Sequence, residues 1–473
     1  MFGIWIGKAI IMFLRLTKKS GTSLPGKVAL RFNSRLIAKL GRQLTTCIVV
    51  TGTNGKTTTA NLLGDILLKD GPTIQNRAGS NMRQGIASTL LLHSSWLGRL
   101  NTRRALFEVD EASLPLLAKE LPIHVAVLTN VFRDQLDRYG ELDLTLNKLV
   151  EGIQQTECSV IANADDPLSL HVAQASGRPY ACYGFEEIRD SQSEDMALTN
   201  HPAGEANEED PFPRDGQFCL ACGNRLTYRR YVYGQLGDYL CEECGFERPI
   251  PEYGGRFAHG TLVVNKDSTA SEYPLPVRGL FNAYNALAAI GCALHLNFEP
   301  RTIAEGLLSF RPPLGRMQAF LTKPAAVLNL IKNPTGADNV LRAVLSEEGR
   351  KVVCLVINDN AADGRDVSWL WDTHFGWIAE NPSVSFVVAS GSRAEDMALC
   401  MKYSGMDVDR LTFSPNVSEG IAHAFAVARE EEDSTLYVLS TYTALVPSAQ
   451  CLKGFEEISD NDHEAARHRA SVS

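Results

Sequence analysis

The fold is decided by residues 46–68, which read TCIVVTGTNGKTTTANLLGDILL. Residues 47–50 are a short apolar run of the kind that forms a buried strand, and aliphatic side chains recur at helical spacing between Leu62 and Leu67. A glycine-containing loop joins these two segments. A strand, a loop and a helix in this order are the repeating unit of an α/β domain, so the sequence predicts a mostly parallel sheet covered by helices.

Apolar runs elsewhere in the chain extend this pattern. Strands are predicted at 104–109, 124–128 and 159–162, each followed by polar residues and a helical stretch. Strands at 351–357, 384–389 and 436–439 alternate with helical stretches in the same way and predict a second, smaller α/β domain. The 473 residues exceed one ordinary hydrophobic core, which agrees with about two or three domains.

Shifts in composition predict the domain boundaries. We expect an N-terminal helical segment at 1–45, a central domain at 46–312, a C-terminal α/β domain at 313–455 and a polar tail at 456–473. Residues 190–255 form an insertion in the central domain. It begins within 186–210, where nine acidic side chains and few aliphatic ones are typical of a solvated linker. The C-terminal boundary is placed near Pro312 and Pro313.

Composition and cysteine usage indicate a soluble protein of a reducing compartment. The chain is 44% hydrophobic and 21% charged with a net charge of −9, so it offers no electrostatic basis for nucleic-acid binding. Its eleven cysteines are scattered apart from four between Cys219 and Cys244, unlike the disulfide framework of a small secreted domain. We therefore expect a cytoplasmic protein.

The first 16 residues are apolar but contain Lys8 and Arg15, so they are short for a membrane span and lack the order of a signal peptide. On a helix, Lys8, Arg15 and Lys19 fall on one side and leave a broad apolar face. This face either packs on the body of the protein, which is the more common use of such a helix, or rests peripherally on the inner face of the cell membrane.

The candidate nucleotide site is the loop between the first predicted strand and helix, which consists of Gly52, Thr53, Asn54, Gly55, Lys56, Thr57 and Thr58. At the start of a helix, backbone N–H groups and the helix dipole can surround an anion. Gly52 and Gly55 would let the main chain approach phosphates closely. Lys56 would neutralise the β- and γ-phosphates, and the Thr57 hydroxyl could bind Mg²⁺. The alternative is an ordinary glycine turn, since Val50 stands where the usual motif has its first glycine.

Glu108 closes a predicted strand within the run Phe107-Glu108-Val109-Asp110-Glu111. Hard cations favour carboxylate oxygen, so Glu108 is the candidate second ligand of Mg²⁺. As a single acid it could equally be the partner of a helix N-terminus.

Four cysteines form two pairs with metal-ligand spacing. Cys219 and Cys222 are separated by eighteen residues from Cys241 and Cys244, and a glycine follows each pair. This is the four-thiolate zinc pattern, which leaves no open coordination position and so predicts a structural zinc ribbon. Free buried cysteines are the alternative. A nucleic-acid function for the ribbon is not favoured, because its basic residues are offset by the acidic linker.

The glycine loop resembles the ATP-binding loop of Mur ligases and folylpolyglutamate synthetases, whose shorter glycine spacing accounts for Val50. Further similarity to these enzymes lies at 81–82, 108, 129–138, 163–167 and 281–289, which together span the central domain. The cysteine ribbon inside such a domain, and NDNAADGRDVSW at 358–369, are similar to the MurT family, the ligase-like subunit of lipid II isoglutaminyl synthase. The resemblance implies a Mur ligase-like central domain, an inserted zinc ribbon and a MurT-type C-terminal domain.

The resemblance also implies an activity and a partner. In that family ATP phosphorylates the α-carboxylate of D-glutamate in the stem peptide of lipid II, and ammonia displaces the phosphate to give D-isoglutamine. The ammonia comes from a glutamine amidotransferase partner, GatD, which supplies a Cys and a His. Asp366 occupies the position that would complete the triad by orienting the imidazole. Asp363 and Asp359 are the alternatives, and Asp366 could instead cap the following helix.

Further roles carry over from the ligases by position. Asn282 would meet the adenine, Arg316 would approach the phosphates, and Asn81 would lie near the γ-phosphate or the substrate. Lys56 and Glu108 would serve catalysis together with Asp366. The stretch NLIKNP at 329–334 departs from the Asp-Tyr-Ala-His-Asn-Pro-like stretch of the amino-acid-adding ligases, and no position matches the modified lysine that binds a second Mg²⁺ in many of them.

Two other functions remain open at this point. The chain could be a Mur-type ligase that adds an amino acid to a UDP-muramyl peptide, in which case it would work without a partner. It could also be a non-catalytic scaffold that binds ATP and carries a zinc ribbon.

Overall fold

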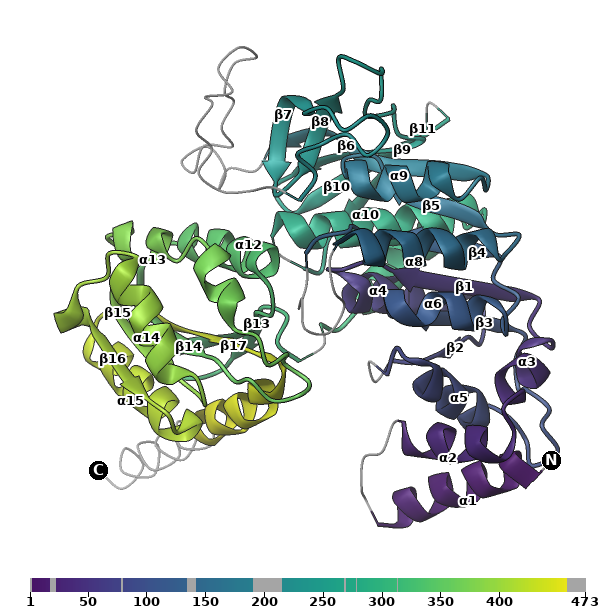
Figure 1. Ribbon diagram of the computed structural model, residues 1–473. Helices are drawn as coiled ribbons and strands as arrows, with labels where there is room; N and C mark the ends of the chain where they lie inside the picture. The colour runs from purple at the N-terminus through teal and green to yellow at the C-terminus, as the bar shows by residue number, and fades with distance from the viewer. Residues whose placement is uncertain are drawn as a thin grey trace. The chain divides into compact units, whose positions relative to one another are not determined.

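The computed structural model describes residues 2–17, 23–77, 80–133, 142–189, 215–267, 269–277, 279–312 and 314–456 (Figure 1). These residues form two compact units, the first ending at Arg311 and the second beginning at Pro312. The motif residues 134–138, Pro313, residues 190–214 of the acidic linker and the tail from 457 lie outside the described residues.

The first unit is built on a sheet in which nine strands are described, in the order β11-β10-β9-β6-β5-β4-β1-β3-β2. The strands are β1 (Thr46–Thr51), β2 (Ile74–Gln75), β3 (Arg104–Glu108), β4 (Val125–Leu128), β5 (Ser159–Asn163), β6 (Tyr180–Arg189), β9 (Tyr253–Ala258), β10 (Thr261–Lys266) and β11 (Thr269–Pro274). Neighbours from β2 to β9 pair in parallel, whereas β10 is antiparallel to β9 and β11. The mostly parallel α/β sheet predicted from the sequence is confirmed.

Helices cover both faces of this sheet. Side chains alternate along β1, so that Cys47 and Val49 join one hydrophobic core while Ile48 and Val50 join the other. The first core is closed by α1 (Phe2–Leu16), α2 (Leu24–Phe32), α3 (Leu36–Gly41), α5 (Arg83–Leu92), α6 (Leu114–Ala118), α8 (Leu142–Gln154) and α9 (Pro167–Ala175). The second is closed by α4 (Lys56–Asp70), α10 (Leu280–His295) and α11 (Pro300–Ser309). A strand buried on both faces explains the unbroken apolar run at 47–50.

The N-terminal segment, predicted to be helical over 1–45, forms α1, α2 and α3 and belongs to the first unit. Ile4 of α1, Ala29 of α2 and Leu36 of α3 are fully buried in the same core as Cys47. Figure 1 shows α1 and α2 side by side at one end of this unit, next to α5. One face of α1 therefore packs on the body of the protein.

The cysteine-containing insertion folds as a small hairpin module. Strands β7 (Thr227–Tyr233) and β8 (Leu236–Leu240) pair in an antiparallel two-stranded sheet, separate from the large sheet. Cys219 and Cys241, both buried, reach the same hydrophobic core as α9. The insertion is thus packed onto the domain that carries it.

The second unit is a smaller α/β domain, as predicted. Six of its strands are described, in the order β12-β13-β17-β14-β15-β16, and those other than β12 pair in parallel. The strands are β12 (Gln318–Phe320), β13 (Ala325–Leu330), β14 (Arg350–Val356), β15 (Val384–Ser390), β16 (Leu411–Ser414) and β17 (Ser434–Ser440). The helices are α12 (Pro334–Leu345), α13 (Gly376–Glu380), α14 (Ala394–Tyr403) and α15 (Val417–Glu430), with short 3-10 turns η2 (Ser368–Asp372), η3 (Val408–Arg410) and η4 (Tyr442–Ala444).

Candidate functional site

The glycine loop lies between the end of a parallel strand and the start of a helix. β1 ends at Thr51 and α4 begins at Lys56. Gly52 and Gly55 have φ values of 119° and 83°, in the left-handed region that favours glycine. Because Gly55 is the N-cap, no side chain caps α4, and the positive end of a 15-residue helix faces the loop. This is the local geometry of an anion site.

The residues that follow β4 hold the loop in place. The Asn130 carbonyl oxygen accepts the Thr53 N–H at 2.7 Å, and the Asn130 side chain accepts the Asn54 N–H at 2.9 Å. The Asn130 amide also donates to Asn54 O at 3.1 Å. In addition, the Thr53 hydroxyl accepts the Phe132 N–H at 3.0 Å. The loop is therefore fixed by neighbouring protein groups, so a ligand need not order it.

The loop lysine is buried and paired with Glu111. Lys56 Nζ donates to Glu111 Oε1 at 2.9 Å, to Thr53 O at 3.2 Å and also to Gly52 O. Burial by itself would lower the pKa of Lys56, but the charge and hydrogen bond of Glu111 outweigh it and raise the pKa. Burial raises the pKa of Glu111, and the charge of Lys56 offsets part of this rise. The loop thus keeps an ammonium group in a buried position against one carboxylate.

Glu108 lies beside the loop because β3 pairs with β1, with Glu108 opposite Val50. Its side chain is buried, and Oε1 accepts from the Asn81 amide at 3.1 Å. Its backbone is held by Asn76, which accepts the Glu108 N–H and donates to Glu108 O, both at 2.9 Å. The structure therefore brings together two residues that sequence reasoning proposed separately, Asn81 and Glu108.

The start of α10 also lies next to the glycine loop. Asn285 donates to Asn282 Oδ1 at 3.3 Å, and Asn285 Oδ1 accepts from the Thr59 hydroxyl at 3.4 Å. A Cβ at Gly55 would lie only 1.9 Å from Asn285 Oδ1, so glycine is required for this approach. Asn282 is thereby placed at the same end of α10 as the residue that touches the loop.

These groups are a suitable donor set for a magnesium nucleotide. The loop offers backbone N–H groups, a helix N-terminus and the Lys56 ammonium, and Glu108 offers carboxylate oxygen. Thr57 is half-buried. In the part of the chain that the structure describes, Thr58 Oγ1 is buried without a hydrogen-bond partner. A buried hydroxyl of this kind is suited to a further polar ligand.

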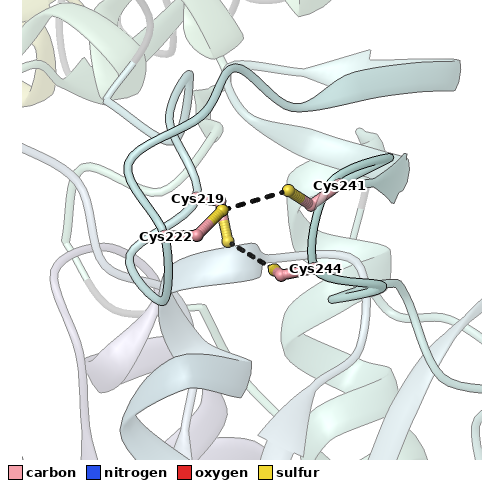
Figure 2. A group of neighbouring side chains, drawn as sticks. All are labelled: Cys219, Cys222, Cys241 and Cys244. Atoms are coloured by element: carbon pink, nitrogen blue, oxygen red, sulfur yellow. Dashed lines mark hydrogen bonds between the residues drawn. The ribbon is translucent and has the colours of Figure 1, made fainter.

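The four cysteines meet in one cluster (Figure 2). Their sulfur atoms all lie within 4.8 Å of one another, and Cys219 Sγ is 3.5 Å from Cys244 Sγ, as Cys222 Sγ is from Cys241 Sγ. Disulfide bonds would need about 2 Å, whereas thiolates around one tetrahedral zinc are about 3.8 Å apart. The cluster could therefore hold a metal ion.

Both cysteine pairs adopt the same turn. The N–H of Gly223 donates to Cys219 O at 2.8 Å, and the N–H of Gly245 donates to Cys241 O at 2.9 Å. The two glycines have positive φ values of 81° and 75°. A repeated turn with glycine in the left-handed region explains why a glycine follows each pair in the sequence.

Comparison with known proteins identifies the family. Residues 330–445 match the family model described as MurT ligase C-terminal, and residues 50–206 match that of the Mur ligase middle domain. A protein of Staphylococcus aureus (strain COL), named lipid II isoglutaminyl synthase (glutamine-hydrolyzing) subunit MurT, is 33% identical over 93% of this chain and 95% of its own length. This chain belongs to the MurT family.

Other comparisons agree with this assignment to the MurT family. The protein of Streptococcus pneumoniae (strain ATCC BAA-255 / R6) with the same name is 32% identical, over 91% of this chain and 92% of its own length. The solved structure of a pseudomurein peptide ligase type C from Methanothermus fervidus superposes with a TM-score of 0.66 at 22% identity, over 86% of this chain and 78% of the other. At that identity, the superposition shows a shared Mur ligase-type fold.

In the MurT-type second unit, Asp366 lies just before η2. Its Oδ1 accepts the Ser368 N–H at 2.8 Å, and this hydrogen bond lowers the pKa of Asp366. The side chain is half-exposed. Asp366 thus binds the first N–H of η2, although the N-cap residue of this turn is Val367. Arg316, also in this unit, is half-buried in the turn before β12.

The two alternative aspartates of this MurT segment are engaged more fully. Asp363 is buried, and its two carboxylate oxygens bind the Thr443 N–H at 2.7 Å and the Thr443 hydroxyl at 2.5 Å. Asp359 accepts from the Ser392 hydroxyl at 2.7 Å and lies 3.8 Å from Arg393. Both side chains therefore support the fold of the loop.

Sequence reasoning missed several residues of the MurT first unit. Glu111, Asn130 and Asn285 each lie inside a quoted motif, but no role was assigned to them. The sequence signal that could have identified these three residues is their position in the chain. Each follows the end of a strand or the start of a helix that lies next to the loop.

A fourth missed residue is Gln235. It connects the cysteine module to the residues after β4, which hold the glycine loop in place. Its amide donates to Val131 O at 2.6 Å and to Asp166 Oδ1 at 3.1 Å. Arg248 adds a second connection, with Nε 2.6 Å from Asp165 Oδ1. No local pattern marks Gln235, because its partners lie more than 60 residues away in the chain.

Proposed function

We propose that this chain is the ligase subunit of a lipid II isoglutaminyl synthase and converts the α-carboxylate of D-glutamate in the stem peptide of lipid II to the amide of D-isoglutamine. The observation that carries the proposal is the match to MurT proteins over more than nine-tenths of the chain. The glycine loop with its buried lysine supports the nucleotide-dependent step.

The reaction takes two steps in this proposal. A carboxylate oxygen attacks the γ-phosphorus of ATP. The bond between this phosphorus and the bridging oxygen breaks, ADP leaves with the electron pair, and an acyl phosphate remains. Ammonia then attacks the acyl carbon, the C–O bond to phosphate breaks, and the nitrogen loses a proton. Because the first step moves charge onto phosphate oxygens, positioned cations and N–H donors supply most of the catalysis.

The proposed nucleotide contacts are supported by the geometry of the first unit and by the resemblance to the ligases. The backbone between Gly52 and Gly55 and the N-terminus of α4 would surround the phosphates. Thr57 and Glu108 would hold Mg²⁺, and Asn81 would orient Glu108 through the 3.1 Å hydrogen bond it already makes. Asn282, near the loop through Asn285, would meet the adenine. The remaining loop residues, Thr53, Asn54 and Thr58, would shape the cradle.

Lys56 exchanges partners in this proposal. An entering triphosphate would compete with Glu111 for the ammonium group, which now lies 2.9 Å from Glu111 Oε1. Because burial raises the pKa of Glu111, this carboxyl can take up a proton when the ammonium turns to the phosphates. Glu111 would therefore keep the charge of Lys56 in place between turnovers.

The cysteine cluster is proposed to bind a structural zinc ion. Four sulfurs within 4.8 Å of one another could complete a tetrahedral site, which would leave no position for a substrate, and cysteine thiolates are preferred zinc ligands. The ion would stabilise the module that carries Gln235 and Arg248.

The relatives are named as a subunit, and we propose that the partner of this chain is a GatD-type glutamine amidotransferase. Asp366 is the residue proposed to orient the partner's histidine. Its support is a half-exposed carboxylate that accepts the Ser368 N–H from its own loop, whereas Asp363 binds Thr443 and Asp359 lies beside Arg393. Arg316 is proposed to approach the phosphates, as the resemblance to the ligases implies.

The proposed substrate is lipid-linked, so we place the protein at the inner face of the cell membrane. Among the described residues, no helix has the length and apolar character needed to cross a bilayer. We propose that the attachment is peripheral.

The test is synthesis from lipid II, Mg-ATP and a nitrogen source, followed by mass analysis of the stem peptide. Amidation lowers the peptide mass by about one unit, and ADP should appear in equal amount. Consumption of an amino acid in place of ammonia by the isolated chain would instead identify an amino-acid-adding ligase. Retention of ATP without ADP release under every condition would identify a scaffold.

A further inference from the structure

The outer face of α1 is apolar although it is exposed. Helix residues at spacings of three and four lie on one side, and here they are large apolar side chains. Their exposed fractions are 60% for Phe2, 48% for Trp5, 55% for Met12, 62% for Phe13 and 76% for Leu16. We call these five residues, with the exposed Phe32 of α2, the N-terminal apolar surface. A helix that covers a core normally presents polar residues outward, so this surface is unusual.

The inner face of α1 fixes this orientation. Gly3, Ile4 and Gly7 are buried against the unit. A Cβ at Gly7 would lie 2.5 Å from Leu91 Cδ1, and one at Gly3 would lie 2.9 Å from Ala29 O. The helix backbone therefore packs closely on α2 and α5 and cannot turn its apolar outer side inward without losing this contact.

Neighbouring aromatic residues widen the surface. The rings of Phe2 and Phe32 meet edge to face at 5.4 Å, and Trp5 Nε1 donates to Trp96 O at 3.0 Å. Trp96 is itself 49% exposed, and Leu97 beside it is 66% exposed. The exposed apolar side chains thus continue from α1 onto α2 and onto the segment after α5.

The charge of the residues around this surface indicates which kind of partner covers it. The first 55 residues contain nine Lys and Arg and no Asp or Glu, although the whole chain has a net charge of −9. Among them Arg15 is exposed on α1 between Phe13 and Leu16, and Lys27 and Arg31 are exposed on α2. Two such surfaces would repel each other in a dimer, whereas a bilayer rich in anionic lipid attracts basic residues and accepts tryptophan and phenylalanine at its interface.

We infer that the N-terminal apolar surface inserts into the headgroup region of an anionic lipid bilayer, with the surrounding Lys and Arg contacting lipid phosphates. The inference rests on the proposed function, which requires a lipid-linked substrate. It also joins that membrane surface to the reaction site, because the Ser23 hydroxyl at the start of α2 lies 2.7 Å from that of Ser80, next to Asn81.

The experiment is flotation of the full-length protein, with any co-purifying subunit left in place, on vesicles of phosphatidylglycerol or of phosphatidylcholine. The wild-type protein should float with the anionic vesicles and much less with the neutral ones. Phe13→Glu combined with Leu16→Glu should lower the floating fraction about tenfold or more, since two apolar anchors become acidic. Both side chains point outward, so the melting temperature should not change.

A matched control places two glutamates on other exposed leucines of the same unit. Leu116→Glu with Leu308→Glu starts from side chains 55% and 61% exposed and should float like the wild-type protein. The inference is overturned if the wild-type protein stays with the vesicle-free fraction, or if the Phe13 and Leu16 variant floats as well as the control. It is also overturned if that variant turns a wild-type dimer into a monomer, which would assign the surface to a second copy.

A water-soluble stem-peptide substrate separates this inference from the proposed function. The Phe13 and Leu16 variant should amidate that substrate at the wild-type rate, because the soluble substrate needs no bilayer. Failure of the wild-type protein to amidate any substrate would refute the proposed function, while flotation would still decide on the membrane surface.

Discussion

Replacing Gly55 with alanine tests the close contact between the glycine loop and α10. The added Cβ would lie 1.9 Å from Asn285 Oδ1, well below the 3.0 Å that Cβ atoms keep from other heavy atoms. The loop or the asparagine must therefore move by roughly 1 Å, and a misplacement of that size can lower turnover about a hundredfold. The φ of 83° adds about 1–2 kcal/mol of backbone strain for any residue with a Cβ.

Gly177→Ala separates the contact from the backbone strain. Gly177 has a φ of 65°, and a Cβ there would meet no atom within 4 Å. This variant should lose stability by a similar amount while keeping turnover. A second control is Asn285→Ala, alone and combined with Gly55→Ala, because removal of the asparagine amide makes room for the new Cβ.

The assay is ammonium-driven amidation together with the dissociation constant for Mg-ATP from titration calorimetry. Gly55→Ala should lower turnover about a hundredfold and weaken nucleotide binding, and the double variant should recover part of the loss relative to Asn285→Ala. Equal turnover of Gly55→Ala and Gly177→Ala would refute the reasoning, because the contact with Asn285 would then carry no cost.

Four further outcomes are expected. Lys56→Ala should abolish amidation with either nitrogen source and lower the melting temperature by leaving Glu111 buried without its partner, and adding Glu111→Gln should restore the melting temperature but not the activity. Asp366→Asn should block glutamine-driven amidation and spare ammonium-driven amidation, and equal loss with both would exclude the orienting role. Cys222→Ser or a zinc chelator should weaken Mg-ATP binding as well as unfold the cysteine module, whereas unchanged binding in a metal-free protein would show that the module is not coupled to the loop. Burial raises the pKa of Asp166 to about 7 from 3.8, so the folded chain holds a proton that the unfolded chain releases between these values. Its contribution to stability should be full below about pH 4 and lost above about pH 7, and melting curves of Asp166→Asn, set against wild type from pH 5 to 8, should lack this slope.

Local features of the chain could be predicted from the sequence because they depend on residues that are close together in the chain. The run at 47–50, the glycine loop and the start of α4 lie within one stretch, and both cysteine pairs are turns closed by their own glycine. The strand pattern of both units follows from apolar runs in the same way. A prediction of this kind depends on the neighbours of a residue in the chain, which the sequence shows directly.

Contacts between distant segments could not be predicted in the same way. Glu111 binds Lys56 across 55 residues, and Thr59 meets Asn285 across 226. Glu111 was visible as one of three acids in a five-residue run, but the sequence does not tell which of them turns toward the lysine. The broad apolar face predicted for α1 was also ambiguous, because hydrophobicity alone does not tell which part of it is buried and which is exposed.

The cysteine module is connected by hydrogen bonds to the residues that support the glycine loop. Asn130 holds the loop backbone, and the next residue, Val131, accepts a hydrogen bond from Gln235 of the module at 2.6 Å. The Val131 N–H is bound in turn by Asp166, which also accepts from Gln235. The proposed metal ion would help to keep Gln235 in this position, because a module of this size has little core of its own. Metal binding at the cysteines and nucleotide binding at the loop are therefore expected to be energetically coupled through residues 130 and 131, and each should strengthen the other by the same factor.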